Sequence, residues 1–121
     1  MRTAIVKIRG KEYIACFSTR VLMALEEREG DSTKGLQRIL SENKVSDLFW
    51  LLAQMIDAGD RYAKLEGLDN PGKLALDDLI DLIGVDEYEG VFRAVTETVK
   101  AGNTPTVEVK PSKNGKATQG A

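Results

Sequence analysis

The chain has 121 residues, of which 42% are hydrophobic and 30% charged, and it carries a formal net charge of −2. Such a length and composition favour one globular domain. The small negative charge provides no overall field that would attract nucleic acid or an anionic membrane. The single cysteine, Cys16, has no partner for an internal disulfide, so we expect it to be a small buried side chain.

The N-terminal residues contain no apolar stretch behind a basic region, and no run in the chain approaches the ~18 apolar residues of a membrane span. We therefore expect no signal peptide, no membrane association and a location in the cytoplasm.

Residues 3–17 have the pattern of a β-hairpin with arms at residues 3–9 and 12–17. Glycine at the first central position, Gly10-Lys11, suits a type II′ turn. An isolated hairpin is marginal in water, so we expect it to pack on helices, on another subunit or on both. The predicted register pairs Ile8 with Tyr13, Val6 with Ala15 and Ala4 with Phe17 on one face, and Arg9 with Glu12, Lys7 with Ile14 and Ile5 with Cys16 on the other.

Four to five helices are predicted to follow, which makes the fold class α+β. The first is capped by Ser18 or Thr19 and runs to about Glu29, before Gly30. Its predicted inward residues are Val21, Leu22 and Leu25. A short helix opens at residues 31–33 and carries Leu36, Ile39 and Leu40. The strongest periodicity spans residues 45–64, where a wide apolar face that includes Leu52 predicts a central helix covered by several neighbours.

Residues 67–72 read as a loop, and a helix is predicted from about residue 74 to residue 83 with Leu76, Leu79, Ile80 and Ile83 inward. Asp86 and Glu89 have the spacing of a capping box that starts the last helix. Its stripe consists of Tyr88, Val91, Phe92, Val95 and Val99. Periodicity stops at Gly102, so we predict one domain over residues 1–101 and a flexible tail over residues 102–121.

The residue types needed for catalysis are poorly represented. The chain has no histidine, so a Cys–His or Ser–His–Asp arrangement cannot form. The loop at residues 67–72 lacks the Lys-Ser/Thr ending of a phosphate-binding loop. We expect no enzymatic activity, no cofactor and no metal, and the lysines and arginines are too sparse for nucleic-acid binding. The acidic residues that could suggest a cation site are expected on solvent-facing helix surfaces: Asp77, Asp78, Asp81, Asp86, Glu87 and Glu89.

Two places are candidates for binding another protein. Trp50 points away from the apolar stripe of its helix, so either another element covers it or it is an exposed aromatic anchor. On the second face of the hairpin, Ile5, Ile14 and Cys16 are apolar, so that face is either covered by a helix of the same chain or open to a partner.

The order of elements and four short motifs resemble the small tail assembly chaperones of long-tailed bacteriophages and prophages of Gram-positive hosts. The motifs are Gly-Lys-Glu-Tyr at residues 10–13, Phe-Ser-Thr-Arg at 17–20, Leu-Met-Ala-Leu-Glu-Glu at 22–27 and Ala-Gly-Asp-Arg-Tyr at 58–62. The resemblance covers roughly residues 2–101.

The resemblance implies a non-catalytic protein that coats the tape measure protein before the tail tube polymerises, and that often self-associates. The polar, rather basic tail from Gly102 departs from this family pattern. Another small phage or bacterial binding module, such as a head–tail connector or an antitoxin, is the alternative interpretation.

Overall fold

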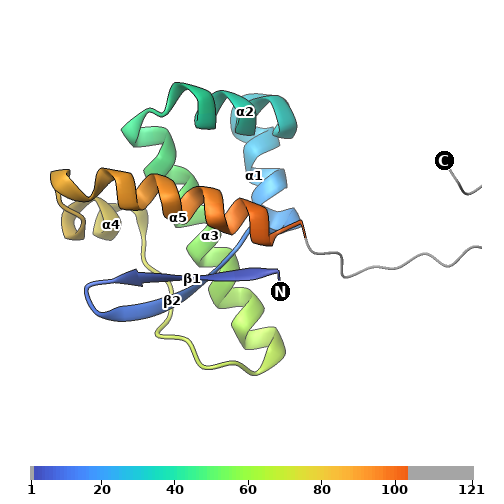
Figure 1. Ribbon diagram of the computed structural model, residues 1–121. Coiled ribbons are helices and arrows are strands. Elements are labelled where there is room, and N and C mark those ends of the chain that lie inside the picture. The colour runs from blue at the N-terminus through green and yellow to red at the C-terminus, as the bar shows by residue number, and fades with distance from the viewer. Residues whose placement is uncertain (1, 104–121) are drawn as a thin grey trace, which may run out of the picture.

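The computed structural model describes residues 2–103, and it has the predicted α+β architecture of a hairpin followed by helices (Figure 1). The predicted tail, residues 102–121, lies outside the described residues except for Gly102 and Asn103, which form a turn after the last helix. The elements in chain order are β1 (Thr3–Ile8), β2 (Lys11–Cys16), α1 (Thr19–Glu29), α2 (Ser32–Glu42), α3 (Val45–Glu66), α4 (Leu76–Leu82), the 3₁₀ helix η1 (Val85–Glu87) and α5 (Tyr88–Ala101).

Three helix boundaries coincide with capping residues in the sequence. The side chain of Asp31 accepts a hydrogen bond from the backbone N–H of Lys34 and so caps the start of α2. Gly30 and Gly67 end α1 and α3 in the left-handed conformation. The capping box predicted for Asp86 and Glu89 is wrong.

The acidic cap of the last helical segment lies earlier in the chain. The carboxylate of Glu87 accepts from the backbone N–H of Gly84 at 2.8 Å, which starts η1 three residues before α5 begins.

The hairpin register differs by two residues from the predicted one. Arg9 and Gly10, not Gly10 and Lys11, occupy the turn, and both have positive φ, 53° and 83°. Two successive left-handed residues are the pattern of a type I′ turn. Val6 therefore lies opposite Tyr13, and Ile5 lies opposite Ile14. Because side chains alternate between the faces with a period of two, this shift leaves every residue on its predicted face.

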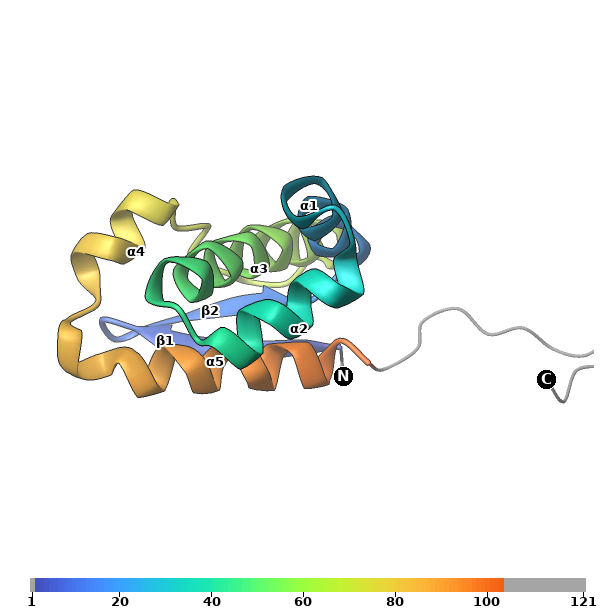
Figure 2. The same ribbon diagram turned by 90° about the horizontal axis from the view of Figure 1, so that it is seen from above.

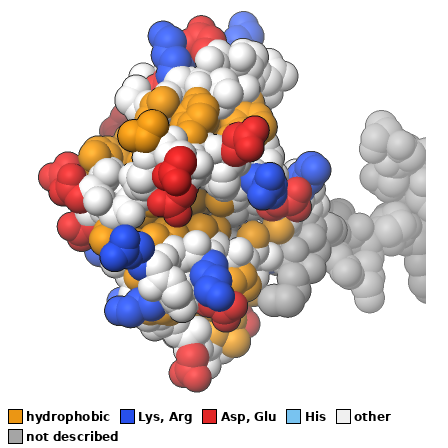
Figure 3. All heavy atoms as spheres, turned by 60° about the vertical axis from the view of Figure 1, so that its left-hand side comes forward, with side chains coloured by type: hydrophobic (Ala, Val, Ile, Leu, Met, Phe, Trp, Pro, Cys, Tyr) orange, Lys and Arg blue, Asp and Glu red, His pale blue; other side chains and the backbone are white. Residues whose placement is uncertain are grey.

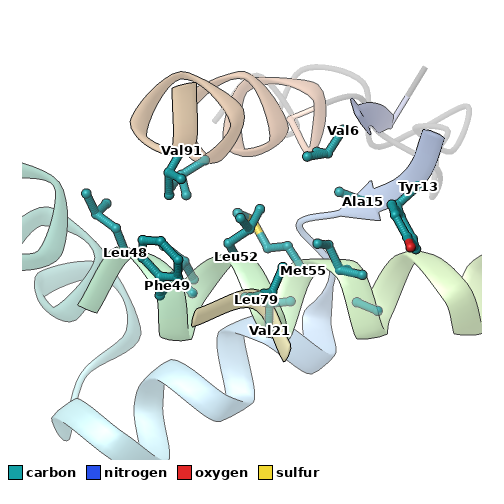
Figure 4. Close-up of a cluster of buried hydrophobic side chains, with 14 of the residues drawn as sticks. Val6, Tyr13, Ala15, Val21, Leu48, Phe49, Leu52, Met55, Leu79 and Val91 are labelled. Atoms are coloured by element: carbon teal, nitrogen blue, oxygen red, sulfur yellow. The ribbon is translucent and has the colours of Figure 1, made fainter. Parts of the chain in front are cut away.

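The hairpin lies between α3 and α5, with β2 on the side of α3 and β1 on the side of α5 (Figure 2). Val91 of α5 points toward Leu52 and Met55 of α3, and Val6 and Ala15 reach the same core from the strands (Figure 4). Leu52 is 1% exposed, in agreement with its predicted place at the centre of the apolar face of α3. Cys16 is buried and unpaired, as expected.

α3 and β2 touch backbone to backbone at Gly59. A Cβ atom at this position would lie 1.8 Å from the carbonyl oxygen of Ile14 and 2.8 Å from the Cα of Ala15. Only glycine permits this approach, and it allows α3 to bury the whole second half of β2.

Two residues predicted to face inward are exposed. Leu22 of α1 is 38% exposed and Ile80 of α4 is 53% exposed. Ile80 is exposed because α4 packs on the core mainly through Leu79, which is fully buried. None of the helices within residues 2–103 has the length and apolar character needed to cross a membrane.

The close contact at Gly59 predicts that adding a single methyl group there strongly destabilises the fold. Gly59→Ala should lower the free energy of unfolding by about 3 kcal/mol, because α3 and β2 must separate to admit the Cβ atom. Gly90→Ala in α5 is the matched control, since a Cβ atom there meets nothing within 4 Å. It should stabilise the protein by about 0.5–1 kcal/mol. Urea unfolding of both variants measures the difference, and equal effects would show that the approach of α3 to β2 is not critical.

Candidate protein-binding surfaces

Trp50 is half-buried and is covered by a side chain of α1. It packs against the hydrophobic core, and the guanidinium carbon of Arg28 lies 4.5 Å from the centre of its ring. This is the geometry of a cation–π contact. Of the two interpretations of Trp50, coverage by another element therefore describes its geometry, since a partner would have to displace Arg28 to reach the ring face.

Arg28 belongs to an ion-pair network that joins the first three helices. Asp47 of α3, which is 5% exposed, accepts hydrogen bonds from Arg28 of α1 at 2.9 Å and from Arg38 of α2 at 3.0 Å. Arg38 also donates to both carboxylate oxygens of Glu29, at 2.7 and 2.9 Å. The bidentate geometry and the low exposure of Asp47 make this network a structural clamp that holds Arg28 over Trp50.

The network shifts the pKa values of its acidic members. Burial raises the pKa of Asp47, but hydrogen bonds from Arg38 and Arg28 outweigh it, so the pKa lies below the ordinary value for aspartate. The hydrogen bonds from Arg38 likewise lower the pKa of Glu29. Both groups are therefore charged at neutral pH.

The second face of the hairpin is half covered. Ile14 is only 8% exposed because α3 approaches β2 at Gly59, so of the two interpretations of this face, coverage by a helix of the same chain describes Ile14. Cys16 on the same face is buried as well. Ile5, which lies opposite Ile14 on β1, is 59% exposed and is accessible.

The outer edge of β2 is closed by a loop residue that sequence reasoning missed. The backbone N–H of Ile14 donates to the side-chain oxygen of Asn70 at 2.8 Å. The amide nitrogen of Asn70 donates to Asp60 at 3.1 Å and to the carbonyl oxygen of Gly72 at 3.0 Å. Asp60 is 6% exposed, and it belongs to the Ala-Gly-Asp-Arg-Tyr motif. The Asn70-Pro71 pair predicted a loop at this position, but nothing in the sequence predicted that Asn70 contacts Ile14.

An apolar groove of about 680 Å³ lies between the start of α3, α4, η1 and the start of α5. Its size is within the range of typical binding sites. The hydroxyl of Tyr88 donates to the carbonyl oxygen of Asn43, which fixes the start of α5 against the turn before α3. The residues that line the groove are Val45, Ser46, Phe49, Leu76, Ile80, Ile83, Gly84, Val85 and Tyr88.

Three large apolar side chains of the groove are open to solvent: Val85 is 98% exposed, Val45 56% and Ile80 53%. They come from three elements, so only the tertiary fold brings them together. Figure 3 views this side of the molecule and shows exposed hydrophobic side chains interspersed with acidic ones. The acidic residues of α4, η1 and the start of α5 are all exposed, as predicted: Asp77, Asp78, Asp81, Asp86, Glu87 and Glu89.

Within residues 2–103 there is no group of three or more His, Cys, Asp or Glu side chains that could hold a metal ion. No protein-family model matches the sequence, and comparison with curated proteins and with solved structures likewise found no match.

The depressed pKa of Asp47 predicts how stability depends on pH. A carboxyl with a lower pKa in the folded state stabilises the fold above its unfolded pKa, and this contribution disappears as the pH falls through the folded pKa. Asp47→Asn should therefore be clearly less stable than wild type at neutral pH, and the difference should shrink below about pH 4. Thermal unfolding as a function of pH measures it.

Asp69→Asn, at an exposed loop residue, is the control and should change stability little at any pH. A difference between Asp47→Asn and wild type that stays constant down to acidic pH would contradict the role given to the ionised carboxylate.

Proposed function

We propose that this protein is a non-catalytic binding module that holds an apolar helical segment of another protein in the groove between α3, α4, η1 and α5. The observation that carries the proposal is the exposure of Val85, Ile80 and Val45 around one apolar concavity. Exposed apolar patches rimmed by polar residues are typical of protein-interaction sites, and a hydrophobic groove is the usual receptor for one face of an amphipathic helix.

The charges near the groove indicate the kind of helix it would bind. The exposed carboxylates on α4 and η1, including Asp81 and Asp86, flank the apolar residues Ile80 and Val85 in the sequence. Such a rim favours a partner whose apolar stripe is bordered by lysine or arginine, and it speeds encounter with that partner. The same carboxylates help to keep the protein in solution when no partner covers the apolar groove.

We further propose, on the resemblance of motifs and element order, that the partner is the tape measure protein of a long-tailed bacteriophage or prophage. A tape measure protein is long, helical and apolar, so it would aggregate if left bare. A small acidic protein with an open apolar groove suits the task of keeping it soluble. In this role the protein acts as a tail assembly chaperone in the cytoplasm of the host cell.

Co-expression with the tape measure protein of the same phage or prophage, followed by a pull-down, tests both parts. Wild-type protein should capture the tape measure protein and keep it soluble. Val85→Glu should weaken capture by at least about tenfold, which corresponds to about 1.4 kcal/mol, because it puts a charge into the desolvated groove. Since Val85 is 98% exposed, the thermal midpoint should not change.

Leu65→Glu is the matched control, because Leu65 is 85% exposed near the end of α3 and does not line the groove. It should bind as wild type does. Equal capture by Val85→Glu and wild type would show that the groove is not the binding site. Failure of wild type to capture the tape measure protein would instead reject the assigned partner.

A further inference from the structure

Another concavity lies toward the end of α3, whereas the apolar groove lies at its start (Figure 1). It has a volume of about 530 Å³ and is lined by the N-terminal part of the chain, the start of α1 and the last turns of α3. None of the lining residues within 2–103 is acidic, and four are cationic: Arg2, Arg20, Arg61 and Lys64. A concavity whose charged walls are all of one sign concentrates ligands of the opposite sign, so this pocket favours an anionic group.

The charge of Arg20 is not used within the described fold. Arg61 donates to Asp57 at 3.1 Å, so part of its charge is already compensated. Lys64 likewise pairs with Asp60 at 3.2 Å. Arg20, by contrast, is exposed at the start of α1, and no hydrogen bond or ion pair among residues 2–103 involves its side chain. Its guanidinium is therefore available to a ligand in the pocket.

The same pocket also presents apolar surface. The buried residues Cys16 and Ala58 line it, together with the half-buried ring of Tyr62. The guanidinium carbon of Arg2 lies 5.6 Å from the centre of that ring, which is the geometry of a cation–π contact. A bare inorganic anion would leave this surface in contact with water. The pocket therefore suits a ligand that joins an acidic group to an apolar side chain.

The last described residues of the chain lie close to this pocket. A Cβ atom on Gly102 would lie 2.7 Å from the carbonyl oxygen of Phe17, so the end of α5 lies against the residue before Ser18. Ser18 itself lines the pocket. The sequence that follows, residues 104–121, contains three lysines and one glutamate. The net positive charge of these side chains likewise favours an acidic ligand that extends beyond the pocket.

We propose that this pocket binds an acidic peptide segment of another protein, in which carboxylates flank an aromatic or large aliphatic side chain. A carboxylate of the peptide pairs with the guanidinium of Arg20, and the apolar side chain packs against Tyr62. The cations surround one concavity and do not form a track along a phosphate backbone, which favours a peptide over nucleic acid. The site takes a ligand of the opposite charge to the one that suits the apolar groove, so it does not depend on the proposed function.

Fluorescence anisotropy of the full chain with labelled synthetic peptides tests the proposal. The probes are peptides Glu-Glu-X-Glu-Glu in which X is Phe, Trp, Leu or Met, and at least one of them should bind. Replacing every Glu of the best probe by Gln removes the charge and should weaken binding by about tenfold or more. Replacing X by Ser removes the apolar contact and should also weaken binding by about tenfold.

A change at Arg20 ties the binding to the pocket. Arg20→Glu should weaken the best probe by about tenfold or more, because it reverses the charge that faces the carboxylates. The variant should keep the thermal midpoint of the wild type, since an acidic residue is favourable in the first turn of a helix and α1 has none there. Lys34→Glu makes the same charge change at an exposed position of α2, away from the pocket, and should bind as wild type does.

Four results would overturn the proposal. The first is that none of the acidic probes binds the wild-type protein at about 1 mM. The second is equal binding of the best probe and its glutamine counterpart. The third is that Arg20→Glu folds and binds as wild type does, or loses no more affinity than Lys34→Glu. The fourth is binding of oligodeoxythymidylate that depends on Arg20 while no acidic peptide binds, which would assign the pocket to nucleic acid.

Discussion

The contact of α3 with β2 at Gly59 is the constraint on which the arrangement of the molecule depends. Because Gly59 lets the backbone of the helix reach the carbonyl oxygen of Ile14, α3 covers β2 closely enough to bury its last four residues. The hairpin is thereby held between α3 and α5, and a two-stranded sheet that would be marginal alone becomes part of the core.

Polar contacts secure the elements around that core at two places. Asn70 joins Asp60 of α3 to the outer edge of β2, so the loop before α4 closes one side of the hairpin. Asp47, bound by Arg28 and Arg38, ties α3 to α1 and α2. Breaking one partner of such a low-exposure ion pair costs more than the pair itself contributes, since a charge is left without compensation.

The same packing decides which surfaces stay open. α3 covers β2 and α5 lies alongside β1, whereas α4 contacts the core mainly through Leu79, which leaves Ile80 beside an apolar groove. Tyr88 at the start of α5 lines the same groove.

Local sequence signals determined the secondary structure and most of the core. Helical periodicity and caps such as Asp31, Gly30 and Gly67 define the helices, and Leu52 is buried as its place in the stripe predicts. The strand register and the exposure of the candidate binding surfaces were decided only by the tertiary structure. A two-residue shift in register leaves the alternation of side chains between the two faces unchanged. The apolar pattern therefore could not distinguish a turn at Arg9-Gly10 from one at Gly10-Lys11. A helical wheel shows which residues share a face but not which neighbour covers it, which is why Ile14 and Trp50 are covered while Ile80 and Val85 are open.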